Sequence, residues 1–317
     1  MADYYIGVDV GGTKIAFALF DVEKQMLDKK VIATNKDLEP EIFFDEISNE
    51  IHEFLESNAI SMENLKGIGI GIPSFLIYEE GYILMTSNLP KIRDFSVRKY
   101  LEKKLKVRIV VDNDGNAAAL AEHRNGAGKG KKHMLYCPVG TGISSAIIIN
   151  GSIFHGSYGW AGESGHSLIT PNTGIKCGCG NQGCFMSHIS GSMIVERIKD
   201  KIEAGENTIL VDLAGGNVED IDAKCILKAH REGDRLAEWA VEHMAEYMGI
   251  WLFNIYQILN INYFVFGGGL VNFGHILFDR AIEHFNDYNK IDLPVEFVFA
   301  ELKDDFGVVG AMELLFD

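Results

Sequence analysis

The chain has 317 residues, of which 47% are hydrophobic and 23% charged, and its formal net charge is −16. This length exceeds that of one typical core and predicts two lobes, and no apolar run reaches the roughly twenty residues that a membrane span needs. The acidic balance argues against nucleic acid as a partner, because phosphate backbones reward basic surfaces.

The N-terminus, MADYYIGVDVGG, lacks a basic segment followed by an apolar one. We therefore expect no secretory signal and a cytoplasmic location. Thiols stay reduced there, which favours metal-bound cysteines over disulfides and predicts that Cys137 and Cys225 are buried free thiols.

The first predicted elements form a hairpin around a double glycine. Apolar residues predict strands over residues 4–10 and 15–20, joined by Gly11-Gly12-Thr13-Lys14. A dinucleotide or P-loop site would instead open a helix here. The turn offers backbone N–H groups, a hydroxyl and an ammonium to a phosphate, and Asp9 is placed to hold Mg²⁺ through water. A plain hairpin without a ligand is the alternative.

The next stretch predicts helices over residues 44–58 and 95–105, and a glycine-laced strand over residues 67–72. Between them, the loop Asn88-Leu89-Pro90 is placed to present an amide to a ligand.

A short strand over residues 108–111 runs directly into Asp112-Asn113-Asp114. Polar side chains at the carboxyl end of a strand lie where open α/β sheets bind ligands. Two carboxylates this close raise at least one pKa, as a general base requires. A helix follows, so Asn113 and Asp114 are alternatively simple N-caps.

A second hairpin is predicted from strands over residues 134–139 and 144–149 around Gly140-Thr141-Gly142. It echoes the first glycine turn, and the pair predicts two related lobes that hold a phosphate chain.

The segment over residues 162–184 combines His166 with Cys177, Cys179 and Cys184. One imidazole and three thiolates form the closed set of ligands typical of structural Zn²⁺. Glu163, three residues before His166, is well placed to reach a polar ligand. A cysteine-rich loop without metal, or a disulfide, is the alternative.

The last third predicts a polar loop over residues 204–222, a long central helix over 235–259 and a buried strand over 261–266. The glycines that follow, Gly267-Gly268-Gly269, permit close backbone approach to a flat ligand such as adenine. A strand over 295–300 and a helix over 307–315 end the chain.

Taken together, these motifs resemble those of the ROK family of sugar kinases and repressors, in the same order from end to end. The residues that carry the resemblance are Asp9 to Lys14, Asn113-Asp114, Gly140 to Gly142, Ala161 to His166, Cys177 to Cys184, and Gly267 to Gly269.

The resemblance implies an α/β, actin-like ATPase (ribonuclease H-like) fold of two lobes around a cleft. Residues 1–115 and 301–317 would form the small lobe, and residues 116–300 the large one. It implies ATP-dependent phosphorylation of a hexose, usually at the 6-hydroxyl, by a homodimer.

The resemblance also implies roles for the single residues. Asp114 would be the general base, and Asn88, Asn113, Glu163 and His166 would hold the sugar, with His166 also binding Zn²⁺. Asp9 would orient Mg²⁺, the two threonine turns would hold the ATP phosphates, and Gly267 to Gly269 would border adenosine.

Three positions depart from the family pattern. Met186 stands where the family usually has a sugar-binding glutamate, so that contact is lost unless His188 replaces it. Ser74 occupies the position of a usual glycine, and Gly115 that of a usual alanine.

The identity of the sugar stays open, as does a function without catalysis. Loop residues after Ile72 and near Asp304 look most like the D-allose kinase branch, so D-allose and then D-glucose are expected, with an N-acetylhexosamine or β-glucoside as alternatives. A repressor would carry a DNA-binding segment ahead of Asp9, for which eight residues leave no room. A non-catalytic sugar sensor is the remaining alternative.

Overall fold

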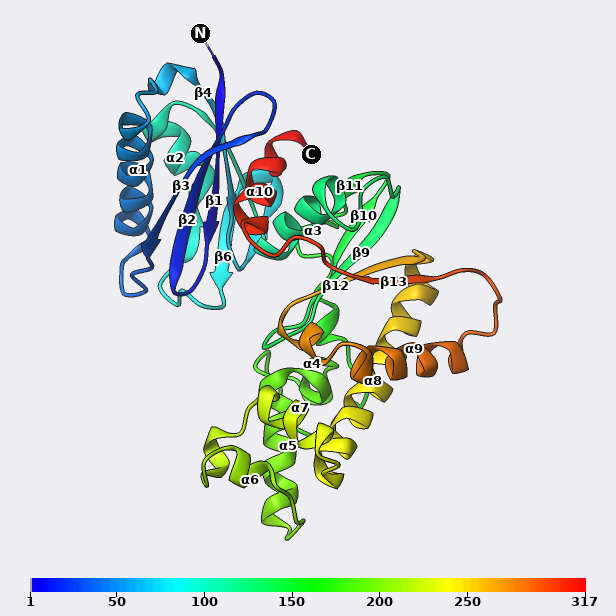
Figure 1. Ribbon diagram of the computed structural model, residues 1–317. Helices are drawn as coiled ribbons and strands as arrows, with labels where there is room; N and C mark the ends of the chain where they lie inside the picture. Colours follow the sequence, from blue (N-terminus) through cyan, green and yellow to red (C-terminus); the bar gives the residue numbers. More distant parts are fainter. Residues whose placement is uncertain (1) are drawn as a thin grey trace. The chain divides into compact units, whose positions relative to one another are not determined.

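A computed structural model describes residues 2–317 (Figure 1). The chain forms two compact units. Unit 1 comprises Met1–Tyr136, Ala146–Gly162 and Ala300–Asp317, and unit 2 comprises Cys137–Ser145 and Glu163–Phe299. This division differs from the expected one, because the residues just after 115 continue a helix of unit 1 and a β-hairpin after residue 145 also belongs there.

Unit 1 is built on a mixed sheet with the strand order β3-β2-β1-β4-β8. Strands β1 and β3 pair antiparallel with β2, and β4 pairs in parallel with both β1 and β8. The strands are β1 Tyr4–Val10, β2 Lys14–Phe20, β3 Met26–Ala33, β4 Leu65–Gly71 and β8 Arg108–Asp112. The predicted first hairpin is confirmed.

Helices cover both faces of this sheet (Figure 1). On one face, α1 (Pro40–Ser57) and α2 (Val97–Leu105) bury their apolar sides in a core with Ile6, Val8 and Val10. These strand residues alternate with residues on the other face, where α10 (Phe306–Glu313) packs.

The contact between α10 and the sheet depends on glycine. A Cβ on Gly69 would lie 1.7 Å from the carbonyl oxygen of Ala311, and one on Gly7 would lie 2.0 Å from that of Val308. The final helix therefore reaches the backbone of the sheet itself.

Unit 1 contains a small second sheet and a further helix. A small sheet consists of β5 (Ser74–Ile77), β6 (Tyr82–Thr86) and β7 (Arg93–Ser96). Helix α3 (Asp114–Asn125) follows β8 and packs on α10, where a Cβ on Gly310 would lie 1.9 Å from the carbonyl oxygen of Ala117.

The second five-stranded sheet has the order β11-β10-β9-β12-β13. Strands β9, β10 and β11 are antiparallel, and β12 and β13 are parallel. Their bounds are β9 His133–Pro138, β10 Ala146–Ile149, β11 Ser152–Ile153, β12 Tyr263–Gly267 and β13 Glu296–Phe299.

Of these strands, β12, β13 and the end of β9 belong to unit 2, and the rest of that unit is largely helical. Its longest helix, α8, spans Arg235–Leu259, as predicted, and packs closely on α9, since a Cβ on Gly249 would lie 2.4 Å from the His284 Cβ. The predicted loop over 204–222 contains a short helix, α6. The helices are α4 Met186–Ile189, α5 Gly191–Glu203, α6 Leu210–Leu213, α7 Ala223–Arg231 and α9 His275–Tyr288. Within residues 2–317, every helix is too short or too polar to cross a bilayer.

Candidate functional site

Acidic residues of unit 1 meet at the carboxyl ends of its parallel strands. Asp9 of β1 is in register with Gly71 of β4, and Gly71 is in register with Asp112 of β8. A Cβ on Gly71 would lie 3.7 Å from the Asp114 Cα, which places the start of α3 directly over this row. This is the edge at which open α/β sheets bind ligands.

Asp114 is the first residue of α3, and its carboxylate accepts the N–H of Gly115 at 3.0 Å. The carboxylate reaches solvent, yet protein surrounds it on most sides. This desolvation, with the negative charges of Asp9 and Asp112, raises the pKa of Asp114 to about 6 and outweighs the Gly115 hydrogen bond. A carboxyl with this pKa is suited to accept a proton near neutral pH.

Asn113 is the N-cap of α3, as its alternative interpretation predicts. Its Oδ1 accepts the N–H of Gly115 at 2.8 Å, and its Nδ2 donates to the Ser74 carbonyl at 3.1 Å. The side chain is thereby held in one orientation beside Asp114.

The first glycine turn is fixed by one hydrogen bond within the turn and one from Thr34. The Gly11 N–H donates to the Lys14 carbonyl at 2.9 Å, and the Thr34 hydroxyl donates to the Gly11 carbonyl at 2.8 Å. Gly11 therefore serves the turn itself. A hollow lies beside the turn, lined by Gly12 and Thr13 and by residues 33–37.

Asn88 packs on this turn, because a Cβ on Gly12 would lie 3.1 Å from the Asn88 Cβ. Burial raises the pKa of Asp9, and the nearby Lys14 and Lys29 oppose that rise. The Asp9 carboxylate also explains Gly307 at the start of α10, where a Cβ would lie 2.4 Å from Asp9 Oδ2. The sequence pattern missed this contact.

In unit 2, the second glycine turn packs on the Gly267 to Gly269 turn. The N–H of Val139 donates to the Gly267 carbonyl at 2.9 Å, and the N–H of Leu270 donates to the Val139 carbonyl at 3.0 Å. Gly268 has a φ of +84°, and a Cβ there would lie 2.5 Å from the Val139 carbonyl oxygen. Gly142 and Gly269 border open space. The structure thus joins two motifs that are far apart in sequence.

The four predicted zinc ligands converge. The ligand atoms of His166, Cys177, Cys179 and Cys184 all lie within 4.8 Å of one another. The Sγ atoms of Cys179 and Cys184 are 3.6 Å apart, close to the roughly 3.8 Å expected for two sulfurs on one tetrahedral Zn²⁺. A disulfide would need about 2.05 Å, so the disulfide alternative is wrong. The donor set fits zinc.

His166 presents Nδ1 to this cluster, 3.5 Å from Cys177 Sγ. Partial burial lowers the pKa of His166, which favours the neutral imidazole that binds metal. Its other nitrogen, Nε2, is then available to a second ligand. The turn that carries Glu163 and His166 packs on the second hairpin, since a Cβ on Gly165 would lie 2.0 Å from the Ile143 carbonyl oxygen.

His188, the residue expected to compensate for Met186, makes its contacts in the interior of unit 2. It is buried and stacks on Tyr247, with ring centroids 3.8 Å apart. Its Nε2 lies 2.7 Å from Thr170 Oγ1, and its Nδ1 lies 3.3 Å from the Arg197 guanidinium. Burial and the Arg197 charge lower the pKa of His188 to about 3. Both ring nitrogens of His188 thus have protein neighbours, and whether position 186 contacts a sugar stays a prediction.

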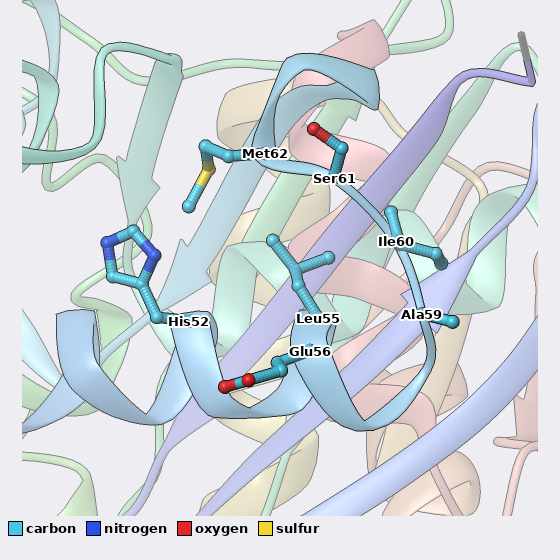
Figure 2. A pocket seen from close by; sticks show the side chains of 7 residues that line it. All are labelled: His52, Leu55, Glu56, Ala59, Ile60, Ser61 and Met62. Atoms are coloured by element: carbon cyan, nitrogen blue, oxygen red, sulfur yellow. The ribbon is translucent and has the colours of Figure 1, made fainter.

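A separate hollow in unit 1 lies away from these residues (Figure 2). It follows the end of α1 and the turn into β4, so it lies at the amino end of β4. His52 and Met62 point toward one another across it (Figure 2). Its lining residues are His52, Leu55, Glu56, Ala59, Ile60, Ser61 and Met62.

The sequence profile of the ROK family matches residues 5–317. The chain belongs to the ROK family. It is 35% identical over 310 residues to a glucokinase of Halalkalibacterium halodurans. The matched region covers 97% of this chain and 93% of the relative.

Solved structures support the same placement. A ROK family glucokinase from Streptomyces griseus, in complex with glucose and AMPPNP, is 31% identical, with a TM-score of 0.77 and 98% coverage of both chains. A ROK hexokinase from Thermus thermophilus is 28% identical, with a TM-score of 0.81 and coverage of 98% and 97%. The two-lobed α/β fold with two mixed sheets and the glucokinase-like group are confirmed, and the similarity does not single out D-allose.

Proposed function

We propose that this protein transfers the γ-phosphoryl group of ATP to the 6-hydroxyl of a hexose, with Asp114 as the general base. The observation that carries the proposal is the Asp114 carboxyl, whose pKa is raised to about 6 at the carboxyl edge of a parallel sheet. Similarity to glucokinases along nearly the whole chain supports the choice of substrate class.

The proposed step needs little covalent chemistry from the protein. Asp114 accepts the proton as the sugar oxygen attacks phosphorus, and the bond from phosphorus to the ADP oxygen breaks. Asn113, fixed as an N-cap, would orient the sugar beside that carboxylate. Glu163 and His166 Nε2 would accept or donate to further ring hydroxyls.

The remaining expected residues would hold the donor. The Gly12-Thr13 and Thr141-Gly142 turns would bind phosphates through backbone N–H and hydroxyl groups, and Gly267 to Gly269 would border adenosine. Asp9 would hold Mg²⁺ through water, and bound Mg²⁺ neutralises charge on the transferring phosphoryl group.

D-Glucose is the first substrate to test, ahead of D-allose, an N-acetylhexosamine and a β-glucoside. Met186 bears on this choice, because a thioether accepts only weak hydrogen bonds and replaces a charged acceptor. A dimer stays a prediction that a measurement of mass in solution tests.

The test is an ADP-release assay with MgATP against these sugars, with bound zinc verified by elemental analysis and Asp114→Asn as the matched control. Turnover with one hexose, lost in the control, supports the proposal. Binding of a sugar without ADP release would point instead to a non-catalytic sensor.

A further inference from the structure

Asp112, beside the proposed base, is fully buried and has three hydrogen-bonding neighbours. Its Oδ1 accepts the N–H of Asn113 at 2.7 Å and the Nδ2 of Asn116 at 3.0 Å. Its Oδ2 lies 2.7 Å from His155 Nε2. Because an ionised carboxylate only accepts hydrogen bonds, this nitrogen carries the proton.

His155 joins Asp112 to two further segments of unit 1. Its ring stacks on Tyr78, with centroids 3.6 Å apart and planes at 15°. Its carbonyl accepts the N–H groups of Gly159 at 3.2 Å and Ala161 at 3.1 Å. One residue therefore ties β8, the segment after β5 and its own loop together.

The loop over residues 154–162 is packed tightly at one further point. Gly159 has a φ of +116°, and a Cβ there would lie 2.5 Å from the Leu76 carbonyl oxygen. Trp160 meets Phe75 edge to face, with centroids 6.2 Å apart. The residue before Phe75 is Ser74, whose carbonyl accepts from Asn113. The loop and the start of α3 thus share neighbours.

We propose that Asp112 and His155 form a positioning pair, in which their hydrogen bond holds the strand end that carries Asn113 and Asp114 against the loop that leads into Glu163. The inference rests on the proposed function, because it gives the pair a role in hexose phosphorylation. Neither side chain needs to touch substrate.

Loss of the hydrogen bond has a definite consequence. Asp112 stays buried with one donor fewer. The loop keeps its backbone hydrogen bonds and packing contacts, and it loses its side-chain hydrogen bond to the end of β8. Small displacements of a base or of a substrate-holding loop reduce turnover strongly. The first glycine turn makes none of the contacts described here, so the interaction with MgATP is expected to be unaffected.

The test compares three variants. His155→Phe keeps a ring that stacks on Tyr78 and removes the donor, and we expect kcat to fall about tenfold to a hundredfold, with a higher KM for the sugar and an unchanged KM for MgATP. His155→Gln places an amide nitrogen near the position of Nε2 and is expected to restore much of kcat. His123→Phe is the control, since His123 Nε2 also makes a 2.7 Å hydrogen bond, to the Lys131 carbonyl.

Hydrogen exchange of the peptide over 154–162 gives a readout that does not depend on turnover. His155→Phe should accelerate exchange there, at the Gly159 and Ala161 amides, and His123→Phe should not. Unchanged kcat in His155→Phe would overturn the proposal, as would equal losses in His155→Phe and His155→Gln. Wild-type protein that phosphorylates no sugar, with exchange still accelerated in the variant, would reject the proposed function and leave the pair as a loop anchor only.

Discussion

Two opposing influences act on the pKa of the Asp114 carboxyl group. It begins a helix, where the helix dipole and the Gly115 N–H favour the ionised form. Protein packed around it and the charges of Asp9 and Asp112 disfavour that form more strongly, and the pKa rises to about 6. The group is ionised above that pH and takes up a proton readily.

Asp114→Asn should keep sugar binding and lower kcat about 10²- to 10⁴-fold, the usual contribution of a general base. The amide retains the shape of the side chain and cannot accept the hydroxyl proton. Titration calorimetry with the sugar and the ADP-release assay measure the two effects. Normal turnover would remove Asp114 as the base.

The pH dependence follows from the same pKa. A base must be unprotonated, so kcat/KM for the sugar should rise with pH through about 6 and then level off. An acid limb near pH 4, the ordinary range of an aspartate, would contradict the environment described for Asp114.

The contribution of Asp114 to the stability of the fold should decrease as pH rises, whereas its activity as a base increases. A carboxyl whose pKa is raised by folding stabilises the folded state below its unfolded pKa, and this contribution is lost as pH rises through about 6. Asn carries no charge, so Asp114→Asn should melt no lower than the wild type at pH 8. A thermal scan at pH 8 therefore also checks that the inactive variant is folded.

At the scale of elements, we expect bound zinc to stabilise the segment that carries His166 and the three cysteines. Cys179 is exposed whereas Cys177 and Cys184 are buried, and chelation would leave three neighbouring thiols without the ion that joins them. Removal of zinc should lower the melting temperature and expose Cys179 to rapid labelling by a thiol reagent. Equal labelling rates before and after chelation would show that no metal protects this thiol.

The contact between α10 and the first sheet makes a sharper prediction. Gly69→Ala would force a methyl group to within 1.7 Å of the Ala311 carbonyl oxygen, so the helix must shift. We expect a loss of about 1–3 kcal/mol in the free energy of unfolding, measured in urea. Gly191→Ala is the control, because the nearest atom to its Cβ would be 3.9 Å away. Similar midpoints for both variants would contradict this packing.

Sequence patterns predicted elements well where one local signal dominates. The long helix α8 matches its predicted bounds because most of its surface is apolar, and the zinc ligands converge because their spacing leaves few other arrangements. Strand β3 was missed, since it is largely exposed and shows no apolar alternation.

The contacts that sequence reasoning missed are those between distant segments. His155 follows an exposed phenylalanine and precedes a glycine, and nothing in that local pattern indicates a partner 43 residues earlier. The packing of Gly307 on Asp9 joins opposite ends of the chain. Both depend on tertiary structure, which single-sequence periodicity does not report.

At the scale of the whole molecule, the chain leaves unit 1 after Gly162 and re-enters it at Ala300. Glu122 of α3 accepts hydrogen bonds from the backbone of this re-entering segment. It is 1% exposed, and its carboxylate accepts the N–H groups of Leu302 at 2.8 Å, Glu301 at 3.2 Å and Ala127 at 2.9 Å.

Glu122→Ala would leave these three donors without their acceptor where the chain re-enters unit 1. Hydrogen bonds to a charged group contribute about 1.5–3 kcal/mol each, and water can replace part of that at a segment near the surface. We expect the free energy of unfolding to fall by about 2–4 kcal/mol, and the exchange of amides in α10 to accelerate, because this helix follows the released segment. Glu196→Ala, at an exposed position on α5, should change stability by less than about 0.5 kcal/mol. If α10 exchanges at the wild-type rate in Glu122→Ala, the contacts of this helix with the sheet and with α3 suffice for its docking, and Glu122 then serves only the turn at Ala127.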